Sequence, residues 1–141
     1  MDTETYTFNH RFSIQVRMTD LDPVGHVNNG VQFSYYDLGR LEYFKTLQNK
    51  AIKWDELDMV IVHASCDFMN SIFLEDKIVV ETKVIGFGEK SVKIIQRIVQ
   101  SETQEIKSTC YSIMSGYDKE NNCSKAISDD FKQKVQEFEG C

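Results

Sequence analysis

A carboxylate, a tight turn and a helix start follow one another in the segment Asp22-Pro-Val-Gly-His-Val-Asn-Asn-Gly30. The first turn of a helix carries backbone N–H groups without intrahelical partners, at the positive end of the helix dipole. Such donors can hold the oxygen of a polarised carbonyl group, as in an oxyanion hole. A carboxylate a few residues upstream can attack that carbonyl or deprotonate a water molecule beside it. This chemistry suits an activated ester and above all a thioester, whose thiolate leaves without strong acid assistance.

The chain reaches this segment through a predicted strand and a turn. Apolar and polar residues alternate over residues 12–19, which predicts a half-buried strand. The strand is expected to stop at residues 20–25, where Pro23 fixes its own φ and Gly25 permits a positive φ. The carboxylate is therefore expected in a tight turn.

A long helix is predicted to follow the turn. From about Asn29 to Gln48, apolar residues recur every three or four positions, and either Asn28 or Asn29 is a suitable N-cap. The helix is apolar around much of its circumference, so we expect the rest of the chain to wrap it.

The remaining pattern is that of strands. After a polar segment over residues 49–58, strand-like stretches occupy residues 59–68, 77–85, 91–99 and 106–114, and Ser128 caps a short final helix. The second and third stretches flank a glycine-bearing hairpin connection. The order of strand, long helix and a four-strand meander lacks the β-α-β alternation of a doubly wound sheet. It predicts an α+β fold with one curved antiparallel sheet around the helix.

Composition limits the class of protein. With 141 residues, the chain is expected to form one domain over residues 1–141. The net charge of −6 argues against nucleic acid as a partner, because duplex binding normally rests on a basic face. No apolar run approaches the ~20 residues that span a bilayer. The acidic, polar start resembles neither a signal nor a transit peptide, so we expect a cytoplasmic protein without a membrane partner.

The cysteines do not form a recognisable metal or disulfide motif. Cys66, Cys110, Cys123 and Cys141 are widely separated, without a Cys-x-x-Cys motif or paired histidines at zinc-ligand spacing. We expect reduced thiols, with the first two in strand cores, and no metal site.

The segment from Asp22 to Asn29, followed on the helix by Tyr35, Asp37 and Arg40, resembles the acyl-CoA thioesterases of the 4-hydroxybenzoyl-CoA thioesterase type. Members of that family have the hotdog fold, in which one curved sheet wraps a long central helix. The order of strand, helix and four strands is also that of the family, so the resemblance covers about residues 8–118.

The resemblance implies a role for each residue of the motif. Asp22 corresponds to the catalytic aspartate, as nucleophile or general base. The amide that polarises the thioester carbonyl corresponds to that of Asn29, with Gly30 beside it. His26 and Asn28 match the residues that shape the substrate pocket and its loop.

Further binding residues are predicted outside the motif. Tyr35 is expected to line the substrate pocket, and Lys90, at the hairpin, is a candidate for docking a coenzyme A phosphate. Asp20 is expected to be structural and to bond loop amides. The sequence departs from the family pattern at Gln32, where the family often has tyrosine, and this leaves the substrate preference open.

The leading hypothesis is therefore hydrolysis of an acyl-CoA or acyl-carrier-protein thioester, with coenzyme A as part of the substrate and no separate cofactor. The resemblance also implies a homodimer or homotetramer with each active site at a subunit interface. One alternative is a hotdog hydratase or dehydratase acting on enoyl thioesters, although its Gly-Asp-x-Asn-Pro-x-x-His motif is absent. Another is an acyl-thioester binding module without turnover, against which the intact Asp22 argues.

Overall fold

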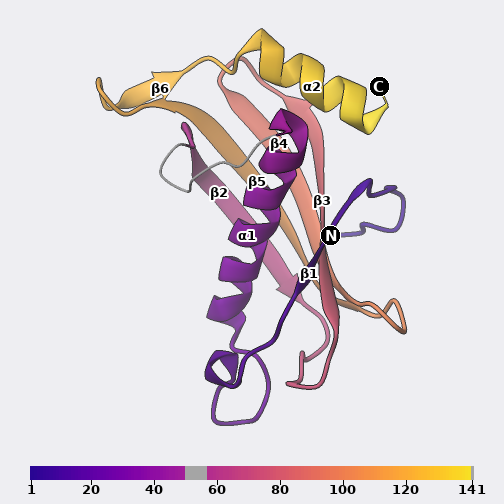
Figure 1. Ribbon diagram of the computed structural model, residues 1–141. Helices are drawn as coiled ribbons and strands as arrows, with labels where there is room; N and C mark the ends of the chain where they lie inside the picture. The colour runs from indigo at the N-terminus through magenta and orange to yellow at the C-terminus, as the bar shows by residue number, and fades with distance from the viewer. Residues whose placement is uncertain (50–56, 141) are drawn as a thin grey trace.

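The helix predicted over residues 29–48 is present with those bounds as α1 (Asn29–Gln48), and a curved antiparallel sheet wraps around it (Figure 1). The computed structural model describes residues 1–49 and 57–140. The strands are β1 (His10–Ile14), β2 (Met59–Phe68), β3 (Ile78–Phe87), β4 (Ser91–Gln100), β5 (Ile106–Asp118) and β6 (Cys123–Lys125). A second helix, α2 (Asp129–Glu139), follows the last strand. The predicted α+β hotdog architecture is confirmed.

The order of the strands corrects one prediction. The sheet runs β1-β3-β4-β5-β2, with β6 paired to the end of β5. The four strands after α1 therefore do not form a continuous meander, because β2 lies beside β5 at the edge of the sheet. Connection length explains the difference: residues 88–90 and 101–105 are short enough for hairpins, whereas residues 69–77 form a longer crossing.

The first strand is shorter than predicted. β1 ends at Ile14, and a 3₁₀ turn over Met18–Asp20 begins within the stretch of residues 12–19 that was predicted as strand. The Asp20 carboxylate accepts hydrogen bonds from the Arg17 backbone N–H (3.0 Å) and from Arg17 Nη2 (3.1 Å). These bonds turn the chain away from the sheet. Val16 is nevertheless buried, so the alternation there reflects burial without strand pairing.

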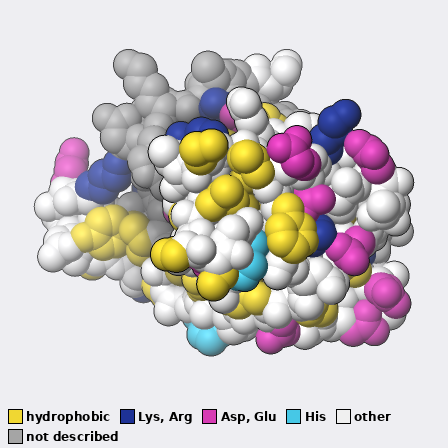
Figure 2. All heavy atoms as spheres, turned by 90° about the horizontal axis from the view of Figure 1, so that it is seen from below, with side chains coloured by type: hydrophobic (Ala, Val, Ile, Leu, Met, Phe, Trp, Pro, Cys, Tyr) yellow, Lys and Arg dark blue, Asp and Glu magenta, His cyan; other side chains and the backbone are white. Residues whose placement is uncertain are grey.

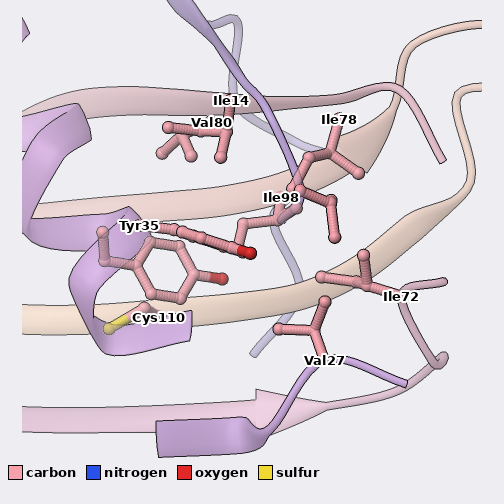
Figure 3. Packing of buried hydrophobic residues seen from close by; sticks show 10 residues of the cluster. Ile14, Val27, Tyr35, Ile72, Ile78, Val80, Ile98 and Cys110 are labelled. Atoms are coloured by element: carbon pink, nitrogen blue, oxygen red, sulfur yellow. The ribbon is translucent and has the colours of Figure 1, made fainter. Parts of the chain in front are cut away.

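Two apolar clusters fill the space between α1 and the sheet. The cluster at the N-terminal half of α1 comprises Ile14, Val16, Val27, Tyr35, Tyr36, Ile72, Ile78, Val80, Ile98 and Cys110 (Figure 3). The cluster at the C-terminal half comprises Tyr43, Phe44, Val84, Val92, Ile94, Met114, Ile127, Phe131 and Val135. Gly39 permits the close approach of α1 to the sheet between them, because a Cβ atom there would lie 2.6 Å from Val80 Cγ1.

The C-terminal helix also forms as predicted. The Ser128 side chain caps α2 by accepting a hydrogen bond from the Phe131 N–H at 3.2 Å. The short strand β6 was not predicted, because three exposed residues carry no periodic signal. Most of the polar connection predicted over residues 49–58, and Cys141, lie outside the described residues. Among the residues that are described, no helix is long and apolar enough to cross a membrane.

Candidate active site

The turn before α1 is closed by its own backbone. The Asp22 N–H donates to the His26 carbonyl at 2.9 Å, and the Asn28 N–H donates to the Asp20 carbonyl at 3.0 Å. Gly25, with φ +92°, forms the tip and donates its N–H to the Asp22 carbonyl at 3.0 Å. Main-chain bonds therefore fix the path of the chain from the carboxylate to the first residue of α1.

A buried carboxylate ties this turn to α1. Asp20 is 3% exposed, and its Oδ2 accepts a hydrogen bond from the Tyr35 hydroxyl at 2.6 Å. Burial acts to raise the pKa of the Asp20 carboxyl, but hydrogen bonds from Tyr35 and Arg17 outweigh it and hold this pKa below its usual value. Burial and the neighbouring carboxylate raise the pKa of Tyr35. The phenol is thus a neutral donor to an ionised carboxylate, in keeping with the structural role expected for Asp20.

Asp22 presents one carboxylate oxygen without a hydrogen bond. Its Oδ1 accepts from the Val24 N–H at 3.0 Å, whereas its Oδ2 lies 3.7 Å from His26 Nδ1, beyond hydrogen-bond distance. Among the described residues, no donor bonds to Oδ2. The His26 ring in turn packs edge-on against Phe73, with 6.5 Å between ring centroids. Oδ2 is therefore the oxygen available to attack a carbonyl or to accept a proton.

The two predicted amide donors at the start of α1 differ. The Gly30 N–H donates to the Asn28 side-chain Oδ1 at 2.7 Å, so the N-cap already engages it. The Val31 and Gln32 N–H groups donate to the Asn28 carbonyl at 3.0 and 3.3 Å. The Asn29 N–H has no acceptor within residues 1–49 and 57–140. A carbonyl oxygen placed at this helix start would thus meet the Asn29 amide first.

The two binding residues predicted outside the motif lie at different places. Tyr35 is buried behind the turn, and its hydroxyl is engaged by Asp20. Lys90 lies at the opposite end of the sheet, where its Nζ is 3.5 Å from Ser124 Oγ of β6. A single chain therefore brings the Asp22 turn and the Asn29 amide together, but it does not bring Lys90 to them.

Apolar side chains at this end of α1 are exposed. Phe33 on α1 is 42% exposed and contacts Phe68 at the end of β2, with ring centroids 6.2 Å apart. Figure 2 shows this end of the molecule from below, with hydrophobic side chains exposed among acidic ones and histidine. Further exposed apolar residues lie in the segment before α1 and in the segment after β2: Met18, Val24, Met69 and Phe73. Sequence reasoning missed this surface, because aromatic residues on an apolar helix were expected to be buried.

The site lacks an obvious place for a metal ion. In the described part of the chain, no group of three or more histidine, cysteine, aspartate or glutamate side chains is arranged to hold one. What the site does offer is a carboxylate oxygen and a backbone N–H at a helix start, held by a closed turn. Such a pair can stabilise an oxyanion and supply a nucleophile or a base.

Comparisons with known proteins identify the family of the chain. A family model of the thioesterase-like superfamily matches residues 16–135. The uncharacterized protein YsmA of Bacillus subtilis (strain 168) is 26% identical over 91 residues, which cover 63% of this chain and 61% of YsmA. The chain thus matches less than two thirds of the length of that curated relative.

Solved structures extend the similarity to nearly the whole chain. A thioesterase from Thermus thermophilus, in complex with coenzyme A and Zn, has 26% identity and a TM-score of 0.84, over 95% of this chain and 97% of that one. A mutant 4-hydroxybenzoyl CoA thioesterase complexed with 4-hydroxybenzoyl CoA has 14% identity and a TM-score of 0.79, over 89% and 97%. The second likeness shows the shared fold. The resemblance inferred from the sequence is confirmed.

Proposed function

The chain belongs to the thioesterase-like superfamily, and from that premise we propose that it hydrolyses an acyl thioester, with acyl-CoA as the substrate class. One observation carries the proposal: the free Asn29 N–H and the unbonded Asp22 Oδ2 stand on either side of a turn closed by backbone hydrogen bonds. The thioesterase from Thermus thermophilus, which binds coenzyme A, supports the choice of substrate class.

In the proposed reaction, the thioester carbonyl oxygen accepts a hydrogen bond from the Asn29 N–H at the positive end of the α1 dipole. Asp22 then attacks the carbonyl carbon directly or takes a proton from a water molecule that attacks it. The tetrahedral oxyanion collapses and expels the coenzyme A thiolate. In the nucleophilic variant, water hydrolyses the resulting anhydride and regenerates the Asp22 carboxylate. Coenzyme A is thus part of the substrate, and the proposed reaction uses no separate cofactor.

The binding residues have supporting parts in this proposal. Asn28 holds the Gly30 amide and with it the first turn of α1, and His26 lies beside the Asp22 carboxylate. Tyr35 holds the turn from behind through Asp20. Lys90 would meet the coenzyme phosphates of an Asp22 site only where a second subunit brings it there.

The proposed assembly is a homodimer or homotetramer, and β2 is the surface that we propose for the contact. Among the described elements, β2 pairs with β5 on one side, which leaves its other edge unpaired. Val60, Ile61 and Val62 on this strand are exposed, the last to 60%. An exposed apolar edge strand is a template for pairing with another chain. Light scattering of Val62→Lys against the parent chain tests this contact: the variant is expected to shift toward the monomer.

The reaction is tested by replacing Asp22 with asparagine. Release of free coenzyme A is followed with a chromogenic disulfide across short, long and aromatic acyl-CoAs. We expect Asp22→Asn to lower kcat by about 10²- to 10⁴-fold with an unchanged melting temperature. The matched control is Asp58→Asn, which removes an exposed carboxylate that pairs with Lys125 near β6 and should keep the parent's kcat.

Three results would contradict the proposal. Near-parent hydrolysis by Asp22→Asn of every acyl-CoA that the parent cleaves would remove Asp22 from the mechanism. Loss of the enoyl-CoA ultraviolet absorbance, or tight acyl-CoA binding without any thiol release, would indicate a hydratase or a binding module instead. The same assay with an acyl-carrier-protein thioester in place of acyl-CoA shows which of the two thioester classes the protein cleaves.

A further inference from the structure

Two cysteines face each other across the β2–β5 pair. In the antiparallel register, Cys66 lies directly opposite Cys110. Beyond the end of β2, the Met69 N–H donates to the Lys107 carbonyl at 3.0 Å in the same register, which marks that pair as hydrogen-bonded. Pair types alternate along an antiparallel ladder. Cys66 and Cys110, three positions away, therefore form a non-hydrogen-bonded pair, the type in which opposite side chains approach most closely.

Both thiols lie on the side of the sheet that faces α1. Cys110 is 2% exposed in the cluster that contains Tyr35 (Figure 3), and Cys66 is half-buried and packs against that cluster. A non-hydrogen-bonded pair has Cα atoms about 4.5 Å apart, within the range of about 4.4–6.8 Å that disulfides span. The pair therefore has the register, the shared face and the spacing that a disulfide needs.

The two thiols differ in reactivity. Interaction with the Cys110 thiol, together with the nearby Arg40 guanidinium, lowers the pKa of Cys66. The same interaction, together with burial, raises the pKa of Cys110. Arg40 is itself held in place, because its Nη1 donates to Gln96 Oε1 at 2.8 Å and its Nη2 donates to Asp37. Cys66 is the more exposed and more readily ionised partner.

From this geometry we propose that Cys66 and Cys110 form a peroxide-oxidisable dithiol that closes reversibly into a disulfide linking β2 to β5. The Cys66 thiolate attacks one oxygen of hydrogen peroxide, which breaks the O–O bond and yields a sulfenic acid and, after protonation of the departing hydroxide, water. Cys110 sulfur then attacks the sulfenic sulfur and displaces the second oxygen, which leaves as water with the Cys110 proton. Two thiols lose two electrons, and peroxide is reduced to two waters.

The link would act on the edge strand of the sheet. Within the described chain, β2 pairs only with β5, and most of its side chains are exposed. Cys66 lies two residues before Phe68, which contacts Phe33 on the second turn of α1. Oxidation would thus fix the strand that flanks the start of α1. The proposal does not depend on the thioesterase reaction.

The test uses the full chain treated with hydrogen peroxide, followed by alkylation of the remaining thiols and peptide mapping by mass spectrometry. On a non-reducing denaturing gel, we expect the Cys66–Cys110 cross-linked peptide in the band of the single chain, and we expect dithiothreitol to return it to two alkylatable thiols. The matched control is Cys123→Ser, which removes an exposed free thiol and should leave the cross-link intact. Cys66→Ser should abolish the cross-link and leave Cys110 alkylatable.

Three results would overturn the proposal. In the first, Cys66 and Cys110 both stay alkylatable while Cys123 is oxidised. In the second, Cys66 proceeds to sulfinic acid while Cys110 remains a free thiol. In the third, either residue forms its disulfide with Cys123 or Cys141. Because the mapping is made on the parent chain, it decides the question even where Cys66→Ser fails to fold.

Discussion

At its N-terminal end, α1 begins with an amide that has no acceptor in the described chain, beside exposed phenylalanines. At its C-terminal end, Asn49 adopts a left-handed conformation with φ +53°, and its N–H returns to the carbonyls of Lys45 and Thr46. That end closes on itself in the manner of a helix C-cap. One helix therefore ends in two different ways, and its N-terminal end keeps a backbone N–H, that of Asn29, without an acceptor among the described residues.

The side chains at the two ends of α1 differ as well. At the C-terminal end, α2 packs over α1, and the Tyr43 ring lies against His10 and Phe138. The Tyr43 hydroxyl donates to the Glu139 carboxylate at 2.7 Å, and Lys83 pairs with the same carboxylate at 2.9 Å. A cavity of about 370 Å³ lies beside this packing, lined in part by Phe44, Leu57, Met59, Ile127 and Phe131.

The comparison separates the roles of packing and chemistry. The C-terminal end has a larger share of the aromatic packing, and close packing is how a fold gains stability. The N-terminal end keeps exposed apolar surface and an unengaged donor, which are features of a binding site. Stability and activity are therefore expected to respond to substitutions at opposite ends of α1.

The largest expected effect on stability is at the C-terminal end. Phe131→Ala removes a buried ring that packs edge-on against Phe44 and Phe87 and should lower the free energy of unfolding by about 3–5 kcal/mol. Well below its melting temperature, the variant should keep the parent's kcat. The matched change is Phe33→Ala at the exposed N-terminal surface, which should raise KM with little effect on denaturant unfolding. A large loss of stability from Phe33→Ala would break the comparison.

A smaller effect is expected from Tyr35, the tyrosine that holds the turn before α1. Tyr35→Phe leaves the buried Asp20 carboxylate without its 2.6 Å donor, at a cost of about 1–3 kcal/mol in unfolding free energy. Because Asp20 supports the turn, kcat should fall while KM changes less. Tyr43→Phe removes a hydroxyl bond to Glu139 at the other end and should lower stability alone. Equal losses of kcat in both variants would remove the positioning role from Tyr35.

The smallest effect is a pH dependence at the C-terminal end. Burial lowers the pKa of His10, against the opposing influence of Glu42 and Glu139, and His10 Nε2 lies 3.2 Å from Thr46 Oγ1. The unfolded chain therefore binds a proton at this histidine more readily than the folded one. Its contribution to stability is complete above the unfolded pKa of about 6.5 and declines as pH falls through and below that value.

Melting temperatures measured between neutral and mildly acidic pH check this dependence. The melting temperature of His10→Asn should decline less steeply with falling pH than that of the parent. His63→Asn, which changes an exposed histidine on β2, should follow the parent's curve. If the melting temperatures of the parent and of His10→Asn fell in parallel with pH, His10 would be excluded as the source of the pH dependence.

Local chemistry in the sequence predicted α1, its N-cap and the turn before it. The bounds of α1 follow from helical spacing, and Asn28 caps it as its residue type favours. The place of β2 did not follow, because strand order depends on long-range pairing that no local pattern encodes. The end of β1 was also missed, since a single carboxylate, Asp20, turns the chain within an alternating run.

For the candidate site, the sequence predicted which residue types gather but not which of their atoms stay available. Gly30 was predicted as an amide donor beside Asn29, but the side chain of the N-cap Asn28 already engages its N–H. The part of Asn28 in shaping the pocket stays a prediction. Lys90 was a candidate on charge and hairpin position alone, and the register of the sheet places it far along α1 from Asp22. The distance between two elements that are far apart in the sequence depends on how the chain packs. Residue types and their spacing do not determine that distance.

The closed turn before α1 has a consequence for how this site can vary. Main-chain bonds join Asp22 to His26 and Asp20 to Asn28, and such bonds do not depend on the side chains between them. The exposed Pro23 and Val24 can therefore change type while the carboxylate stays at the same distance from the helix start. An inserted or deleted residue would shift both bonds out of register at once. The turn therefore tolerates changes of residue type at Pro23 and Val24, but it does not tolerate a change in its length.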